Sequence, residues 1–234
     1  MAGSRLIAAI DTAEATEAAR LIGALNGRVG LIKLGLELFC AHGPACLDWA
    51  QGMPVFLDLK LHDIPNTVAG AVRALLARPP AMLTLHAAGG SAMIAAARDA
   101  AEMAGAARPI LLAVTVLTSL DAHGLAATGV VGAPDTQVLR LAKLALDAGA
   151  DGLVCSAAEV GAIRAAFGAK PVLVVPGIRP AGSARDDQAR TATPEAAMAA
   201  GADYLVVGRP ITQADDPAAA ASAINAAMRA VEPA

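Results

Sequence analysis

The sequence predicts an α/β protein, a (β/α)8 TIM barrel that forms a single domain over residues 1–234. Three observations favour this fold. Strand-like apolar runs alternate with alanine-rich segments of helical length along the whole chain, in eight successive pairs. The strand-like runs are continuously apolar, as in parallel sheets that are covered on both faces. A chain of 234 residues also suits one barrel domain.

The eight predicted strands are apolar runs, and polar residues cluster where they stop. We expect them at Leu6–Asp11, Val29–Gly35, Val55–Lys60, Met82–Ala87, Pro109–Leu117, Gly152–Ser156, Pro171–Pro176 and Tyr204–Gly208. In a barrel of parallel strands, the C-terminal strand ends form the face that carries the active site. The polar residues at these ends are therefore the candidates for binding and catalysis.

Composition excludes several classes of partner. Aromatic residues make up 2% of the chain and the net charge is −3, so we expect no basic face and no stacking surface for nucleic acid. No apolar run approaches the roughly 20 residues that span a bilayer, and the N-terminal residues lack the pattern of a signal peptide. We therefore expect a cytoplasmic protein that binds neither nucleic acid nor membrane.

The cysteines indicate no metal centre. Cys40, Cys46 and Cys155 are odd in number and lack metal-type spacing, which fits reduced thiols. A zinc site formed by Cys40, His42 and Cys46 would lack an evident fourth ligand. We expect these residues to serve helix packing and a loop.

Charged residues end the first two predicted strands. Asp11 either caps a helix that starts near Ala13, where Thr12 would serve as well, or faces a ligand at the catalytic face. Strand alternation points Lys33 into the barrel, and an ammonium group there needs a nearby anion. We expect that anion to be Asp58 on the adjacent strand.

The third predicted strand, an otherwise apolar run, leads into a cluster of three charged residues within residues 55–67. Alternation puts Phe56, Asp58 and Lys60 on one face. Asp63 follows the strand and can bring a second carboxylate to the same lysine. A lysine between two carboxylates stays protonated, and paired carboxylates repel a third anion. The cluster therefore offers a proton donor next to carboxylates that repel a further anion.

A less specific interpretation of this cluster is an ion pair at the end of a strand. Asp63 or Asn66 would then act only as a helix-start residue. Burying three charges costs several kcal/mol per ion, which favours a functional explanation for the set as a whole.

The fourth strand finishes at His86-Ala-Ala-Gly-Gly90, where a loop of small residues leaves room for a ligand or another subunit. His86 has no evident carboxylate partner. Lone histidines more often make structural hydrogen bonds than act as acids or bases. We therefore assign no catalytic role to His42, His62, His86 or His123.

The fifth strand leads into a connection that runs to Pro134, longer than the usual two to six residues or so of such loops. Long loops at this face are lid candidates. Thr118 and Ser119, at its start, are either turn residues or ligand contacts.

At or just after the end of the seventh and eighth strands, a glycine is followed closely by an arginine: Gly177 with Arg179, and Gly208 with Arg209. Barrels commonly bind phosphate with the loops that follow these two strands. Glycine permits close approach of the backbone, and a guanidinium suits bidentate phosphate contact. Either arginine alone would be interpreted as a solvated charge, but the pair predicts a phosphate site.

One run carries a family resemblance. The residues Asp58-Leu-Lys-Leu-His-Asp-Ile-Pro-Asn-Thr67 closely resemble the signature of the orotidine 5'-phosphate decarboxylases, which make UMP in pyrimidine synthesis. The shorter pattern Asp-x-Lys-x-x-Asp is shared with 3-keto-gulonate-6-phosphate decarboxylases and hexulose-phosphate synthases. Near the C-terminal end, Pro176-Gly-Ile-Arg-Pro180, Gln188 and Gly208-Arg209 resemble the family's phosphate-binding set.

This resemblance implies direct decarboxylation of orotidine 5'-phosphate without a cofactor. Lys60 would protonate the ring carbon beside Asp58. The implied catalytic residues are Lys33, Asp58, Lys60 and Asp63. The implied substrate contacts are Asp11, Lys33, Asp58, Lys60, Asp63 and Thr67, with Thr118 and Ser119 on the base and Arg179, Gln188, Gly208 and Arg209 on the phosphate.

The resemblance also implies a homodimer, in which Asp63 and Thr67 complete the site of the neighbouring subunit. Two alternatives stay open, because motif resemblance indicates function less surely than fold. One is a magnesium-dependent sugar-phosphate decarboxylase or synthase, which we expect to lack the full ten-residue run. The other is a non-catalytic phosphate-binding barrel, which would have little reason to keep Lys60 between two carboxylates.

Overall fold

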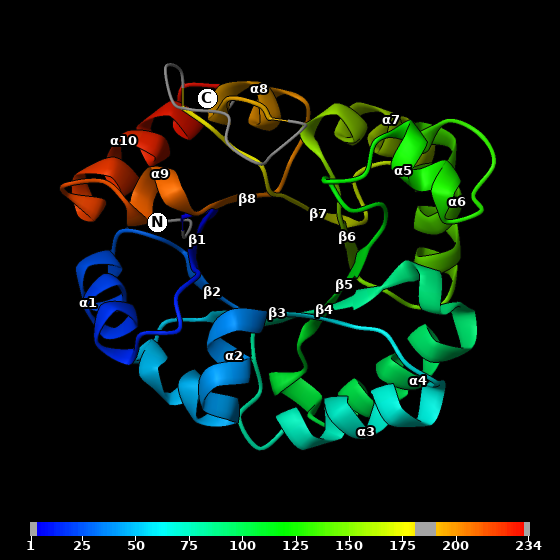
Figure 1. The fold of residues 1–234 in the computed structure, drawn as a ribbon, viewed down its shortest axis with the longest axis horizontal. Coiled ribbons are helices and arrows are strands. Elements are labelled where there is room, and N and C mark those ends of the chain that lie inside the picture. Colours follow the sequence, from blue (N-terminus) through cyan, green and yellow to red (C-terminus); the bar gives the residue numbers. More distant parts are fainter. Residues whose placement is uncertain (1–3, 181–190, 232–234) are drawn as a thin grey trace.

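The structure is a computed structural model that describes residues 4–180 and 191–231. Its strands are parallel and close into a barrel in sequence order, which confirms the predicted (β/α)8 fold (Figure 1). The strands are β1 (Leu6–Ile10), β2 (Leu31–Gly35), β3 (Val55–Leu61), β4 (Met82–His86), β5 (Ile110–Val114), β6 (Gly152–Val154), β7 (Val172–Val175) and β8 (Tyr204–Val207). The predicted strand ends agree with these to within three residues.

Helices surround the ring of strands (Figure 1). They are α1 (Ala15–Leu25), α2 (Leu36–His42), α3 (Pro65–Leu75), α4 (Ser91–Glu102), α5 (Ala122–Ala127), α6 (Pro134–Asp147), α7 (Ala157–Phe167), α8 (Pro194–Ala199), α9 (Arg209–Thr212) and α10 (Pro217–Arg229). Short 3-10 helices cover Gly43–Ala50, Ala87–Gly89 and Gly105–Ala107. None of the helices in the described ranges is long and apolar enough to cross a membrane.

Two apolar layers follow from strand alternation. The larger layer lies between the strands and the helices. The smaller fills the barrel and consists of Ile7, Ala9, Leu31, Phe56, Met82, Leu112, Val174 and Val206. Asp11, Lys33 and Asp58 each lie two positions beyond one of these interior residues. The same alternation therefore places charged side chains directly above the apolar filling, toward the C-terminal strand ends.

The opposite end of the barrel is held by a half-buried carboxylate just before β6. Asp151 accepts the backbone N–H of Leu111 at 2.8 Å and pairs with Arg98 at 2.9 Å and Arg108 at 2.8 Å. Burial raises the pKa of this carboxyl group, but the Arg108 guanidinium and the Leu111 N–H outweigh burial and hold the pKa below its ordinary value. Asp151 therefore stays ionised and ties the start of β6 to β5.

The same arrangement, a carboxylate that binds an arginine and a backbone N–H of the preceding strand, recurs two strands later. Asp203 accepts the N–H of Leu173 in β7 at 2.7 Å and pairs with Arg164 at 2.7 Å. The sequence Ala-Gly-Ala-Asp stands at both places, at 148–151 and 200–203. Its glycine adopts a positive φ in each case, a conformation that costs glycine little. In both places, therefore, the repeat ends a helix at its glycine and begins a strand after an aspartate that binds an arginine and a backbone N–H.

We predict that Asp151→Asn lowers the free energy of unfolding by about 2 kcal/mol, because the change weakens hydrogen bonds to a charged acceptor. Urea denaturation measures this loss. The control is Asp147→Asn, which removes only an exposed pair with Lys143 and should cost less than about 0.5 kcal/mol.

The effect should depend on pH in one direction. The folded-state pKa of Asp151 is depressed, so its contribution is fully present above the unfolded pKa of about 3.9 and is lost as the pH falls through the folded pKa. The difference in the free energy of unfolding between wild type and Asp151→Asn should therefore become smaller only at acid pH. If Asp151→Asn and the control Asp147→Asn lost the same free energy of unfolding, this role of Asp151 would be contradicted.

Candidate active site

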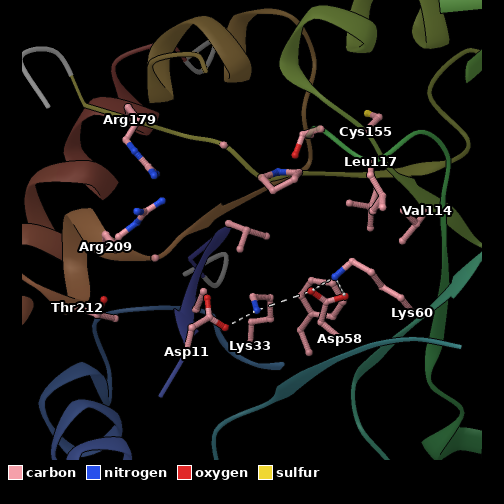
Figure 2. Close-up of a pocket in the computed structure, with 18 of the residues that line it drawn as sticks. Asp11, Lys33, Asp58, Lys60, Val114, Leu117, Cys155, Arg179, Arg209 and Thr212 are labelled. Carbon is pink, nitrogen blue, oxygen red and sulfur yellow. Dashed lines mark hydrogen bonds and ion pairs between the residues drawn. The ribbon is translucent and has the colours of Figure 1, made fainter. Parts of the chain in front are cut away.

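A cavity of about 470 Å³ opens at the C-terminal ends of the strands. Figure 2 shows three kinds of side chain around it. A row of charged residues comes from β1, β2 and β3, two arginines follow β7 and β8, and apolar residues come from the β5 and β6 side. The cavity therefore joins a charged row, a cationic end and an apolar wall.

The charged row alternates in sign. Lys33 Nζ lies 2.9 Å from Asp11 Oδ1 and 3.7 Å from Asp58 Oδ2. Lys60 Nζ donates to both oxygens of Asp58 at 2.9 Å. The row thus runs Asp11, Lys33, Asp58, Lys60 (Figure 2). The predicted pairing of Lys33 with Asp58 is confirmed, although Asp11 is its closer partner.

Asp11 does not cap a helix. The hydroxyl of Thr12 accepts the N–H of Glu14 at 3.1 Å, and α1 starts at Ala15 without a side-chain cap. Asp11 instead pairs with Lys33 and lines the cavity. The capping interpretation of Asp11 is therefore wrong, and its interpretation as a residue of the catalytic face is retained.

Asp58 is the most enclosed carboxylate of the row, with its side chain 13% exposed. Burial raises the pKa of this group, but the charges of Lys33 and Lys60 and the hydrogen bonds from Lys60 and Thr84 outweigh burial and lower the pKa. Asp58 is therefore ionised at neutral pH. It places a fixed negative charge on the cavity wall.

Lys60 reaches the cavity through an irregular strand. Its φ of 49° is in the left-handed region, which is unfavourable for a residue with a Cβ. Its backbone N–H donates to Thr84 Oγ1 at 2.8 Å, and that hydroxyl donates to Asp58 Oδ1 at 2.9 Å. The sequence prediction missed Thr84. The available signal was one polar residue inside the otherwise apolar start of β4.

Asp63 and Thr67 lie outside the cavity of their own chain. The Asp63 carboxylate accepts the N–H of Ile64 at 2.6 Å, and within residues 4–180 and 191–231 it forms no ion pair. Within one chain, the expected approach of Asp63 to Lys60 is therefore wrong. The physical reason is that the chain leaves the barrel here and enters α3 at Pro65, which carries Asp63 and Thr67 onto the exposed surface.

The interpretation of Asp63 as a helix cap also fails. The residue that caps α3 is Ile64, and no side-chain cap is present there. Asn66 lies inside the first turn of the helix rather than before it. The carboxylate of Asp63 is thus exposed at the rim without a capping role.

The cationic end of the cavity contains Arg179 and Arg209. Figure 2 shows both guanidinium groups extending toward the same part of the cavity. Arg179 is buried, follows Gly177 with its positive φ of 76°, and donates to the Ile178 carbonyl at 3.1 Å. Arg209 is the first residue of α9, directly after Gly208. Gln188, which was predicted to join this set, lies outside the described residues.

The apolar wall includes Val114, Leu117 and Cys155 (Figure 2). Burial raises the pKa of the Cys155 thiol, so Cys155 contributes volume rather than a nucleophile. Thr118 lines the cavity as predicted. Ser119 is exposed and is absent from the lining. The long connection beyond them contains α5, which the prediction of a single loop did not include.

The histidines lie outside the lining of the cavity. His42 Nε2 lies 2.7 Å from the Ala13 carbonyl, which is the structural role expected of a lone histidine. The rings of His62 and His86 have centroids 5.3 Å apart. Burial, then the charges of His62 and Lys60, lower the pKa of His86. Within the described part of the chain, no three His, Cys, Asp or Glu side chains are grouped so that they could hold a metal ion.

Comparisons with known proteins agree with this geometry. A family model described as "Orotidine 5'-phosphate decarboxylase / HUMPS family" matches residues 4–224. The orotidine 5'-phosphate decarboxylase of Gluconobacter oxydans is 58% identical over 225 residues, which cover 94% of this chain and 95% of that protein. The enzyme of the same name from Anaeromyxobacter sp. (strain K) is 56% identical over 227 residues, covering 96% and 98%.

A solved structure leads to the same family. The crystal structure of orotidine 5'-phosphate decarboxylase from Lactobacillus acidophilus superposes with a TM-score of 0.86 at 38% identity. The match covers 96% of this chain and 99% of that one. Because sequence model, relatives and structure agree over nearly the full length, the chain belongs to the orotidine 5'-phosphate decarboxylase / HUMPS family.

Proposed function

We propose that this protein converts orotidine 5'-phosphate to UMP and CO2 in pyrimidine biosynthesis, by direct decarboxylation without a cofactor. The observation that carries the proposal is the cavity itself. It holds a row of alternating charges with an enclosed carboxylate at Asp58, and two arginines at another end. A nucleotide that bears both a carboxylate and a phosphate matches these two features.

The proposed chemistry uses the fixed charge of Asp58. A substrate carboxylate placed beside Asp58 is repelled, and this repulsion disappears as the carboxylate leaves as neutral CO2. The C–C bond breaks and its electron pair stays on the ring carbon. The ammonium of Lys60, held 2.9 Å from Asp58, then gives its proton to that carbon. Repulsion in the ground state and protonation of the carbanion both favour product formation.

The arginines supply binding energy away from the reacting carbon. Contacts of Arg179 and Arg209 with the phosphate would hold the base against a charge row that repels its carboxylate. Positioning of this kind can lower a barrier by several kcal/mol, up to roughly 7–11 in model reactions. The remaining proposed contacts are Asp11 and Lys33 on the ribose, Thr118 and Ser119 on the base, and Gln188 and Gly208 with the phosphate.

We further propose that the active form is a homodimer in which Asp63 and Thr67 enter the partner's site. Their exposure in one chain supports this arrangement, and so does the neighbouring Ile64, which is 66% exposed. An apolar side chain of this size at the rim suits a subunit interface. The cytoplasmic location predicted by the sequence is also part of this proposal.

A sugar-phosphate decarboxylase or synthase is the second candidate, because the family description also includes the HUMPS group. The relatives named orotidine 5'-phosphate decarboxylase, at 50–58% identity, favour the nucleotide substrate. The full run from Asp58 to Thr67 favours it as well.

We expect the purified protein to consume orotidine 5'-phosphate in the presence of EDTA, measured as loss of substrate absorbance. Lys60→Ala should lose about 10²–10⁴ in kcat, the usual contribution of a general acid. The control is Lys143→Ala, an exposed residue of α6, which should keep full activity. Activity that EDTA abolishes and magnesium restores would move the protein to the sugar-phosphate group.

We expect Arg209→Ala to reduce kcat/KM strongly for orotidine 5'-phosphate but only slightly for orotidine, which lacks the phosphate. The reason is that Arg209 has no partner on the truncated substrate, so its loss matters only when the phosphate is present. Steady-state kinetics on both substrates measures the difference. Equal losses on the two would show that Arg209 supports the structure.

We expect mixed dimers of Lys60→Ala and Asp63→Ala subunits to regain activity. If Asp63 acts in the partner's site, each mixed dimer has one intact site, so about a quarter of all sites should recover under random pairing in a symmetric dimer. The measurement is activity after mixing, with subunit exchange followed by mass and each single variant shown to be inactive. No recovery after verified exchange would rule out the shared site.

A further inference from the structure

Thr84 is a buried hydroxyl in the sheet that the chemistry above does not use. It is the third residue of β4, is 0% exposed, and follows the buried residues Met82 and Leu83. A hydroxyl enclosed in this way is unfavourable unless its hydrogen bonds are satisfied. Thr84 does not line the cavity. Any effect on the reaction must therefore pass through its neighbours.

Those neighbours are the two central residues of the charged row. Thr84 Oγ1 accepts the backbone N–H of Lys60 at 2.8 Å and donates its proton to Asp58 Oδ1 at 2.9 Å. A threonine hydroxyl has one proton to donate, so this proton is committed to Asp58. One atom therefore links the carboxylate of Asp58 to the main chain of Lys60.

The link lies where the sheet is interrupted. Leu57 is paired with Leu83, and the next registered pair is Leu61 with Leu85. Three residues of β3 thus stand opposite Thr84 alone, and the register of the ladder shifts there. Bulges of this kind leave backbone groups without ladder partners and re-aim side chains. The Thr84 hydroxyl supplies the acceptor that Lys60 N–H would otherwise find in a ladder.

The same contact restrains an unfavourable backbone. Lys60 adopts a φ of 49°, and such a conformation in a residue with a Cβ persists only where the surroundings hold it. With this backbone the lysine side chain turns into the cavity and meets Asp58 (Figure 2). A change in φ at Lys60 would move the whole side chain, including Nζ.

We propose that Thr84 is a positioning residue for the decarboxylation, because its hydroxyl fixes Asp58 and Lys60 relative to each other. This inference rests on the roles proposed above for those two residues. The hydrogen bond from Thr84 is also among the interactions that lower the pKa of Asp58. It therefore favours the charged form on which the proposed repulsion depends.

The test compares Thr84→Val with wild type. Valine keeps the shape and loses the hydroxyl. We expect kcat to fall about 100-fold, the loss that a displacement of reacting groups by about 1 Å can cause. The Kd of UMP, measured by calorimetry, should change less than about threefold because the arginine end of the cavity is unaltered. A merely structural role would instead weaken UMP binding together with kcat.

Two further variants separate the hydroxyl from packing. Thr84→Ser keeps the hydroxyl and loses a methyl group, so it should retain kcat within about fivefold despite a less well filled core. Thr115→Val is the matched control, because Thr115 is also buried, follows the adjacent β5, and donates only a long 3.4 Å bond to the Val154 carbonyl. It should keep wild-type kcat.

Each outcome decides the proposal. Folded Thr84→Val with wild-type kcat would overturn it, as would equal losses in Thr84→Val and Thr84→Ser. If the valine variant does not fold, Thr84→Ser and Thr84→Ala differ by one oxygen atom, and equal kcat in these two would overturn the proposal. Lys60→Ala is assayed alongside. If Lys60→Ala stays active, the role proposed for Lys60 fails as well. If Lys60→Ala is inactive while the Thr84 variants keep wild-type kcat, only the inference about Thr84 fails.

Discussion

The alternation of four charges at the mouth of the barrel is the constraint on which the site depends. Burial penalises the two enclosed ions, Lys33 and Asp58, and each is stabilised by an opposite charge on either side of it. The row exists because three adjacent strands are in one register, with Ala9 opposite Lys33 and Gly35 opposite Asp58. Gly35 contributes by having no Cβ, since a Cβ would lie 3.1 Å from both Lys33 Nζ and Asp11 Oδ1. A shift of one strand would break the row.

Most of the fold and part of the site could be predicted from local sequence patterns. The eight strands follow from apolar runs, and strand alternation correctly placed Lys33, Asp58 and Lys60 on the cavity side. The pairing of Asp11 with Lys33 could not be predicted, because a capping residue and a cavity residue look alike at the end of a strand. The left-handed backbone of Lys60 and its link to Thr84 depend on a register shift between two strands, which one sequence does not reveal.

The two ends of the barrel use charge for different purposes. At the N-terminal end, Asp151 and Asp203 each pair with arginine and accept a backbone N–H of the preceding strand, so these charges are satisfied within the chain. At the C-terminal end, the row runs along an open cavity, and Lys60 remains available to a ligand. Stability and binding are thus assigned to opposite ends of the same strands, which is the usual division in barrels of this type.

The burial of Cys155 protects the wall of the cavity from oxidation. Thiols are oxidised mainly as thiolates that reagents can reach. Cys155 is 1% exposed, and burial raises the pKa of its thiol, so both conditions are missing although the residue borders the cavity. Cys40 is exposed on the outside of the barrel. Peroxide and alkylating reagents would therefore meet Cys40 first, and the wall of the cavity is chemically protected by its own packing.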